Sequence, residues 1–217
     1  MVFDAAELKL PLLGYMVENN VLQQALWQAL EAHPGVTLRV PASLAALHRR
    51  HDGYALELAD GECITPKLVI GADGANSQVR QMAGIGIHAG NMRSRVCLSP
   101  SSVKIRRATA LAAVYANGAA RFLPLFDDWA SLVWYDAPAR IRQLQGLSMT
   151  QLQVEINQHF PARLGAVMPV AAGAFPLTRR HALQYAQPGL ALVGDAAHTI
   201  HPLAGQGVNP GIGMLMR

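Results

Sequence analysis

Two aspartates follow short apolar runs at the places where an open α/β sheet gathers its ligands. Asp73 comes after residues 67–71, and Asp195 comes after residues 189–194. Both runs are typical of buried parallel strands, and ligands bind beyond the carboxyl ends of such strands. A carboxylate there can accept hydrogen bonds from ligand hydroxyl groups. Taken singly, a Gly-Asp such as the one at Asp195 is better explained as a helix cap, with its glycines forming a turn.

The longer of the two motifs is GDAAHTIHPLAGQGVN, at residues 194–209. Small residues surround Asp195, so a ligand hydroxyl can approach its carboxylate. The Gly-Gln-Gly triplet at residues 205–207 removes side chains where backbone must lie against a flat group, and Pro202 fixes the approach of the loop. The residues beyond are expected to begin a helix, whose first N–H groups stabilise negative charge.

These two motifs resemble those of a known enzyme family. GDAAHTIHPLAGQGVN is similar to the flavin-contact motif of the FAD-dependent aromatic hydroxylases, and GADGANSQVR at residues 71–80 is similar to their DG motif. The likeness covers residues 1–90 and 121–209, and within the family it points to the hydroxylases of ubiquinone biosynthesis. Two motifs in this order and separation are a more specific signal than either alone.

The resemblance implies an α/β (α+β mixed) fold. An incomplete Rossmann-like FAD-binding domain would be interleaved with an antiparallel-sheet substrate domain of the aromatic-hydroxylase type. We expect a partial FAD-binding domain with the DG motif at residues 1–90, and a substrate-side sheet domain, atypical over 91–120, at residues 91–180. Residues 181–217 would return to the FAD-binding domain with the GD motif.

The resemblance also implies roles for particular residues. Asp195 would accept a hydrogen bond from a ribityl hydroxyl of FAD, and Asp73 would serve the FAD pyrophosphate region and the nicotinamide donor. Arg80 would contact the donor's phosphates. No side chain is implied as catalytic, because the flavin carries out the oxygen transfer. The expected cofactor-binding residues are Asp73, Gly74, Arg80, Gly194, Asp195, Pro202, Gly205, Gln206, Gly207, Val208 and Asn209.

The reaction implied by the family is flavin reduction by NAD(P)H, followed by insertion of one oxygen atom of O₂ into the ring of a polyprenyl quinol. Such an enzyme would be cytoplasmic, with peripheral association at the inner face of the membrane or with a ubiquinone-biosynthesis complex. No uncharged apolar run approaches the ~18 residues that cross a bilayer. The N-terminus lacks the basic region of a secretory signal.

Composition excludes several other classes of protein. Hydrophobic residues make up 51% of the chain and charged residues 15%, which excludes a disordered, highly charged chain. The two cysteines, Cys63 and Cys97, offer neither a disulfide framework nor metal-ligand spacing. His198 and His201 lie at i, i+3 without a third ligand nearby, so no metal site is expected.

The net charge of +4 comes from one segment. Residues 91–120 hold five basic residues and no acidic one, so this segment carries +5 and the rest of the chain sums to 4 − 5 = −1. The segment has no aromatic interleaving and no recognisable reader motif. We therefore expect no nucleic-acid binding, which would appear as salt-sensitive affinity lost on deleting residues 91–120.

Around the two motifs the chain alternates helix and strand signals. Apolar residues at helical spacing predict a helix over residues 21–30, ended by His33-Pro34-Gly35. Further strands are predicted at 36–40, 43–47 and 54–58 as an antiparallel meander, and at 122–126 and 131–135 as a hairpin. Further helices are predicted through residues 79–82 and over 150–160, and an extended segment is predicted at 174–177.

Three features depart from the family pattern. The chain contains no G-x-G-x-x-G, the turn that holds the ADP half of FAD, and the expectation is of a chain truncated at both ends. Residues 91–120 have no clean period and resemble a shifted reading frame, and Met214 stands where the family has an aspartate. FAD affinity far below that of an intact relative is therefore expected. A non-catalytic remnant or interaction module that no longer binds FAD is the alternative interpretation.

Overall fold

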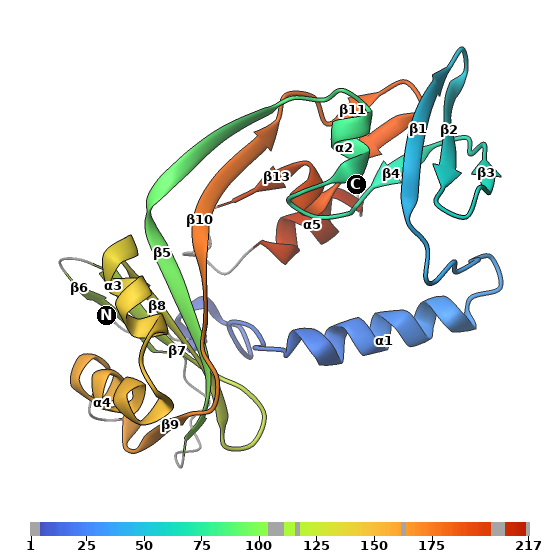
Figure 1. The fold of residues 1–217 in the computed structure, drawn as a ribbon. Coiled ribbons are helices and arrows are strands. Elements are labelled where there is room, and N and C mark those ends of the chain that lie inside the picture. Colours follow the sequence, from blue (N-terminus) through green and yellow to red (C-terminus); the bar gives the residue numbers. More distant parts are fainter. Residues whose placement is uncertain (1–4, 104–110, 116–117, 162–163, 201–206, 216–217) are drawn as a thin grey trace. The chain divides into compact units, whose positions relative to one another are not determined.

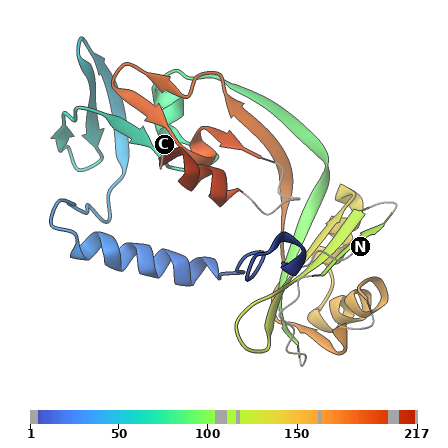
Figure 2. The same ribbon diagram turned by 180° about the vertical axis from the view of Figure 1, so that it is seen from behind.

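The computed structural model describes residues 5–103, 111–115, 118–161, 164–200 and 207–215. The fold is a mixed α/β arrangement with antiparallel sheets (Figures 1 and 2). It divides into two compact units. Unit 1 comprises Met1–Leu38 and Arg95–Phe175, and unit 2 comprises Arg39–Ser94 and Pro176–Arg217. The three domain ranges expected from the sequence stay predictions.

Unit 2 contains the antiparallel meander predicted near the N-terminus. Its strand order is β1-β2-β3, and β1 faces β2 in a register that pairs Leu47 with Leu56. The prediction of a strand at residues 36–40 is wrong, because no strand forms there and Val40 is 67% exposed. Alternating residues that find no neighbouring strand leave their backbone groups to solvent. The three strands are β1 (Leu44–Arg50), β2 (Gly53–Leu58) and β3 (Cys63–Ile64).

The two apolar runs that precede the motifs are neighbouring strands in unit 2, as predicted. β4 (Val69–Gly71) and β12 (Leu190–Leu192) pair in parallel, and β11 (Ala186–Gln187) completes a sheet of order β11-β12-β4. Gly71 is needed at the end of β4, because a Cβ atom there would lie 2.8 Å from Leu192 Cδ2. Both motif loops therefore leave the same edge of one sheet.

Short helices follow both strands. α2 (Gln78–Met82) comes after β4, while the 3₁₀ turn η3 (Gly194–Ala196) and strand β13 (His198–Thr199) come after β12. The helix expected beyond the second motif is present as α5 (Val208–Leu215). Met214 of α5 packs against the core of unit 2. The buried residues of that core are Tyr54, Val69, Ile85, Ala182, Leu190, Leu192, Ala196 and Ala197.

The large antiparallel sheet has the strand order β13-β10-β5-β8-β7-β6, with β9 paired to β5. The predicted hairpin is confirmed, because β7 pairs with β8 along its length. No strand was predicted over residues 91–120, but β5 and β6 lie in the described part of that stretch, and β5 obtains its register from pairing with β8. The strands are β5 (Ile87–Val103), β6 (Leu111–Tyr115), β7 (Gly118–Pro124), β8 (Trp129–Asp136), β9 (Val167–Pro169) and β10 (Gly173–Ala182).

Among the residues that the structure describes, three α-helices belong to unit 1. The predicted first helix is α1 (Asn19–Ala32), which ends at His33. α4 (Met149–His159) begins at a capping box in which Ser148 and Gln151 each bond the other's backbone N–H. α3 (Pro138–Gln145) was not predicted, and a short 3₁₀ turn, η1 (Ala6–Leu8), lies near the N-terminus. α3 and α4 cover the sheet, and the core between them contains Phe122, Leu132, Trp134, Ile141, Leu144, Leu152 and Ile156.

Candidate functional site

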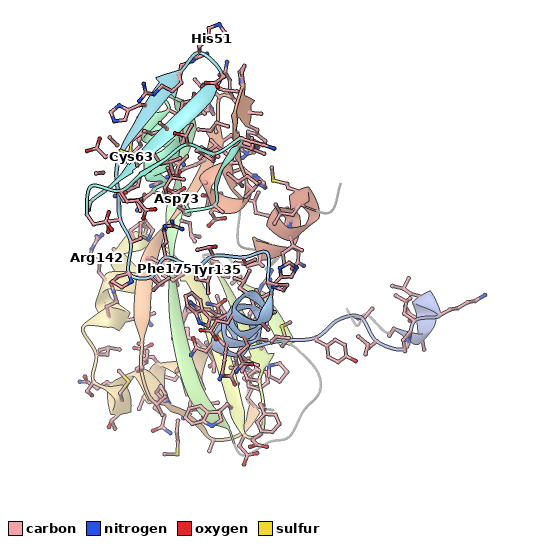
Figure 3. The ribbon with its side chains drawn as sticks, turned by 90° about the vertical axis from the view of Figure 1, so that its right-hand side faces the viewer. His51, Cys63, Asp73, Tyr135, Arg142 and Phe175 are labelled. Atoms are coloured by element: carbon pink, nitrogen blue, oxygen red, sulfur yellow. The ribbon has the colours of Figure 1, made fainter. Side chains whose placement is uncertain are left out.

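Asp73 lies in the loop between β4 and α2, where its side chain accepts hydrogen bonds from the loop and from α2 (labelled in Figure 3). The Ser77 hydroxyl donates a hydrogen bond to Asp73 Oδ1 at 2.5 Å, and the Val79 N–H donates to Oδ2 at 3.1 Å. Ser77 Oγ in turn accepts from the Arg80 N–H at 3.0 Å. The Asp73 carboxylate and the Ser77 hydroxyl thus satisfy donors in the first turn of α2, as capping side chains do.

The electrostatics of this loop favour an ionised Asp73. Burial raises the pKa of the Asp73 carboxyl, but hydrogen bonds from the Ser77 hydroxyl and from nearby backbone N–H groups outweigh burial and hold that pKa below its ordinary value. Oδ1 accepts from the Ser77 hydroxyl and Oδ2 from the Val79 N–H, and a carboxylate oxygen has lone pairs for more than one donor. Asp73 is therefore first a helix cap, with acceptor capacity left for a ligand.

Arg80 joins the two motif loops. Its side chain is buried, with 4% of the residue exposed. One terminal nitrogen donates to the Ala196 carbonyl at 2.9 Å, and the other donates to the Ala75 carbonyl at 3.0 Å. Sequence reasoning missed this link, since nothing in the spacing pairs residue 80 with residue 196. The phosphate-binding role expected for Arg80 stays a prediction, and this geometry favours a positioning role instead.

Asp195 is exposed, as Asp73 is, but it differs in its hydrogen bonding. It lies in η3, and among the residues that the structure describes its carboxylate has no hydrogen-bond or ion-pair partner. The preceding Gly194 has φ +58, with open space around the position of a Cβ atom. Ala196 and Ala197, each 1% exposed, anchor the turn in the core. An anchored turn that presents a free carboxylate is suited to accept hydrogen bonds from ligand hydroxyls.

Two buried polar atoms of the same motif lack partners. Within the described part of the chain, His198 Nδ1 and Thr199 Oγ1 are inaccessible to solvent and form no hydrogen bond. Such groups are rare in folded proteins and mark places where a further partner is needed. They lie three and four residues beyond Asp195, so the motif carries unmet hydrogen-bonding capacity close to its free carboxylate.

A comparison with known families decides what these loops belong to. The family described as the FAD binding domain matches residues 11–214. The chain belongs to this FAD-binding family. A match of that extent runs through both motif loops and through residues 91–120.

Curated relatives of this FAD-binding chain agree with the assignment. It is 71% identical over 212 residues to 3-demethoxyubiquinol 3-hydroxylase of Escherichia coli, covering 97% of this chain and 54% of that protein. It is 40% identical over 202 residues to ubiquinone hydroxylase UbiL of Rhodospirillum rubrum, covering 92% of this chain and 47% of that protein. The chain thus spans about half the length of these relatives.

Solved structures share the fold. The FAD-binding chain aligns to pqsL, a probable FAD-dependent monooxygenase from Pseudomonas aeruginosa, with a TM-score of 0.77 and 22% identity, over 88% of this chain and 56% of that one. It also aligns to aklavinone-11 hydroxylase, solved with FAD and aklavinone, with a TM-score of 0.75 and 19% identity, over 91% of this chain and 39% of that one. The expected aromatic-hydroxylase fold is confirmed.

Not all expected cofactor-binding residues can be placed. Pro202, Gly205 and Gln206 lie outside the described residues. Gly207 directly precedes α5, and Val208 and Asn209 form its first turn. α5 approaches the GD loop closely, since a Cβ atom at Gly211 would lie 3.1 Å from Gly194 Cα. The cofactor contacts of these residues, and of Gly74, stay predictions.

The residues near Asp195 fit the flavin side of FAD. The ribityl chain of FAD carries hydroxyl donors, which match the Asp195 carboxylate, for which the described residues supply no donor. The phosphate side differs, because residues 1–217 contain no G-x-G-x-x-G. The fit is therefore to one half of the cofactor.

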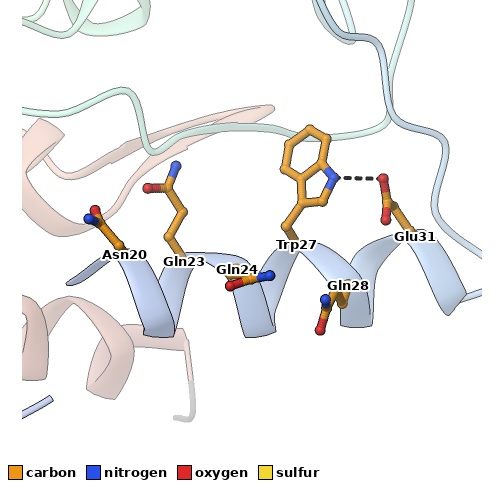
Figure 4. Close-up of a pocket in the computed structure, with 6 residues that line it drawn as sticks. All are labelled: Asn20, Gln23, Gln24, Trp27, Gln28 and Glu31. Carbon is orange, nitrogen blue, oxygen red and sulfur yellow. Dashed lines mark hydrogen bonds between the residues drawn. The ribbon is translucent and has the colours of Figure 1, made fainter. Parts of the chain in front are cut away.

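Other features of the described residues carry no cofactor motif. A groove of about 510 Å³ runs along α1, where the Trp27 indole N–H donates to Glu31 Oε1 at 2.6 Å (Figure 4). Among the described residues, no group of three His, Cys, Asp or Glu side chains is arranged to hold a metal ion. The same residues form no helix with the length and apolar content needed to cross a bilayer.

Proposed function

We propose that this chain is part of a flavin-dependent monooxygenase that hydroxylates a polyprenyl benzoquinol in ubiquinone biosynthesis. The printed names of two relatives, a 3-demethoxyubiquinol 3-hydroxylase and a ubiquinone hydroxylase, support the substrate class. Because the chain spans about half of each, activity and substrate belong to this proposal. Co-substrates would be O₂ and NAD(P)H.

One observation carries the proposal. The parallel pairing of β4 with β12 brings the DG and GD loops to one sheet edge, and Arg80 ties them together. Asp195 is exposed there, with no hydrogen-bond partner among the described residues. Ligands of open α/β sheets gather at such an edge. A structural aspartate would have protein donors, as Asp73 has, so a free carboxylate on an anchored turn favours ligand binding.

The chain's own residues would bind and orient the cofactor. Asp195 would accept a hydrogen bond from a ribityl hydroxyl, and the backbone that leads into α5 at Gly207 would offer N–H donors to the flavin ring. Arg80 would keep the two loops at a fixed separation. When bound, FAD supplies the redox chemistry that activates O₂. The protein's remaining tasks are to position the quinol and exclude water.

The site of action follows from the substrate. A polyprenyl quinol dissolves in the membrane, so the enzyme would meet it peripherally at the cytosolic face, alone or within a biosynthetic complex. Asp73, with lone pairs left beyond its two capping bonds, is the proposed contact for the FAD pyrophosphate region and the nicotinamide donor.

The alternative function is an interaction module that binds no flavin. Residues 1–217 contain no G-x-G-x-x-G, the turn at which pyrophosphate binds in dinucleotide-binding folds. The two functions differ in whether the chain binds FAD at all.

The test is a titration with FAD followed by flavin fluorescence, on the unmodified chain and on two variants. Asp195→Ala removes the proposed contact, and Asp128→Ala removes an exposed aspartate of unit 1. We expect saturable binding by the unmodified chain and by Asp128→Ala, weakened about tenfold in Asp195→Ala by loss of one hydrogen bond to a charged group. Equal binding by both variants would remove the role assigned to Asp195. No flavin signal from any protein would favour the interaction module.

A further inference from the structure

A second cavity lies in unit 2, and the proposed function makes no use of it. It has a volume of about 350 Å³, and its described lining consists of His88 and Gly90 from β5 and Arg179 and His181 from β10. Three of these four residues carry nitrogen donors, and none is a carboxylate. A cavity of this size is at the lower end of the range for small-molecule sites.

Hydrogen bonds fix how these donors are presented. Arg179 Nε donates to His181 Nε2 at 3.5 Å, so that imidazole nitrogen is an acceptor. The other ring nitrogen, Nδ1, therefore carries the proton and donates to Tyr185 Oη at 3.1 Å. Among the residues the structure describes, the two terminal nitrogens of Arg179 have no partner. They form a charged fork suited to bidentate contact with an oxyanion.

The wall behind this fork is built from stacked rings. His181 faces His198 across the β10–β13 pair, with ring centroids 6.1 Å apart and 18° between the planes. Tyr185 stacks on the same His198 ring at 5.8 Å and 12°. His181 is thus held from three sides, by Arg179, Tyr185 and His198. The lining is arranged before any ligand arrives, which reduces the ordering cost of binding.

We propose that this cavity is a binding site for a phosphate group. The two terminal nitrogens of Arg179 would contact two phosphate oxygens, and the exposed His88 would donate to a third. Three donors that line one cavity match a tetrahedral phosphate better than a planar carboxylate, which has two oxygens. The group would arrive either as free phosphate or on a small phosphoester. This inference is independent of the proposed flavin function.

The test follows histidine ring resonances by NMR while the full chain is titrated separately with inorganic phosphate, adenosine monophosphate and acetate at constant ionic strength. The expected result is saturable shifts of the His88 and His181 signals with a phosphate-bearing probe and much weaker shifts with acetate. Tighter binding of the monophosphate would assign the site to phosphoesters, and tighter binding of inorganic phosphate would assign it to the free ion. Acetate binding as strong as phosphate would overturn the proposal.

Two variants separate the site from general charge effects. Arg179→Gln should weaken phosphate binding about tenfold, whereas Arg142→Gln, which removes the same charge from the exposed face of α3, should leave binding unchanged. Equal weakening in both would mean unspecific attraction and would refute the site. His88→Asn provides a second test if Arg179→Gln fails to fold, and unchanged affinity in it would equally count against the proposal. No flavin is needed, so failure here is distinguishable from failure of the proposed function.

Discussion

Replacing Arg80 with methionine should destabilise the chain by about 3 kcal/mol. Hydrogen bonds to a charged group contribute about 1.5–3 kcal/mol each. The Ala196 residue is 1% exposed, so its carbonyl would be stranded without water, at a cost of about 2 kcal/mol. Ala75 is half-buried and its carbonyl still accepts a hydrogen bond from Arg180 Nη1 at 3.2 Å, so the loss of the second bond costs about 1 kcal/mol. Methionine keeps most of the apolar packing of the arginine stem.

Thermal unfolding followed by circular dichroism measures this effect. For a chain of this size, about 3 kcal/mol corresponds to a fall in Tm of roughly 6–12 °C. Amide hydrogen exchange should also quicken in the loops around Ala75 and Ala196, because nothing else in the described residues ties these two carbonyls to one side chain. Arg142→Met, on the exposed face of α3 (Figure 3), is the control and should shift Tm little. An unchanged Tm in Arg80→Met would show that the cost of desolvating the buried guanidinium is as large as the stabilisation from its hydrogen bonds. It would refute the role of Arg80 in stabilising the two loops.

Two further changes test the elements around the site. The folded-state pKa of Asp73 lies below its unfolded value, so the stabilisation by the ionised carboxylate is present above about pH 4 and is lost as pH falls through the folded pKa. Asp73→Asn should therefore lower Tm at neutral pH. A decrease in Tm that is equally large in acid would contradict this account, which depends on the charge. Gly189→Ala should cost at least about 2 kcal/mol, since Gly189 has φ +78 and a Cβ atom there would lie 2.7 Å from Gly53 Cα. Gly173→Ala, at an open position, should leave Tm unchanged or slightly raised.

Local pattern was enough to predict the elements that position the site. The two apolar runs that become β4 and β12 could be recognised because strands buried on both faces consist of apolar residues throughout. The first helix and the β7–β8 hairpin were equally clear, since each has a strong period and an identifiable end. The strand predictions failed where pairing with a distant strand determines whether a strand forms. Residues 36–40 alternate but find no partner, whereas β5 lacks a period and obtains its register from β8.

The candidate site was predicted in outline and missed in its connections. The spacing located both aspartates and the sheet edge they share, but gave them similar roles. The link from Arg80 to the Ala196 carbonyl joins positions 116 apart in the sequence, and no periodicity reports such a contact. The phosphate cavity was missed for the same reason, because His88 and Arg179 come from strands 91 positions apart.

The different tasks of the two aspartates follow from the residues that come after them. Ser77 lies four positions beyond Asp73, at the start of a helix whose N–H groups need acceptors, so that carboxylate is drawn into its own loop. Asp195 is followed by two alanines that are buried and offer no side-chain donor, and its turn is a short 3₁₀ segment. A carboxylate that has no donor among the described residues is available to a ligand. We therefore expect Asp195, rather than Asp73, to bind the cofactor, because a hydroxyl group of the cofactor can donate the hydrogen bond that the described residues do not provide.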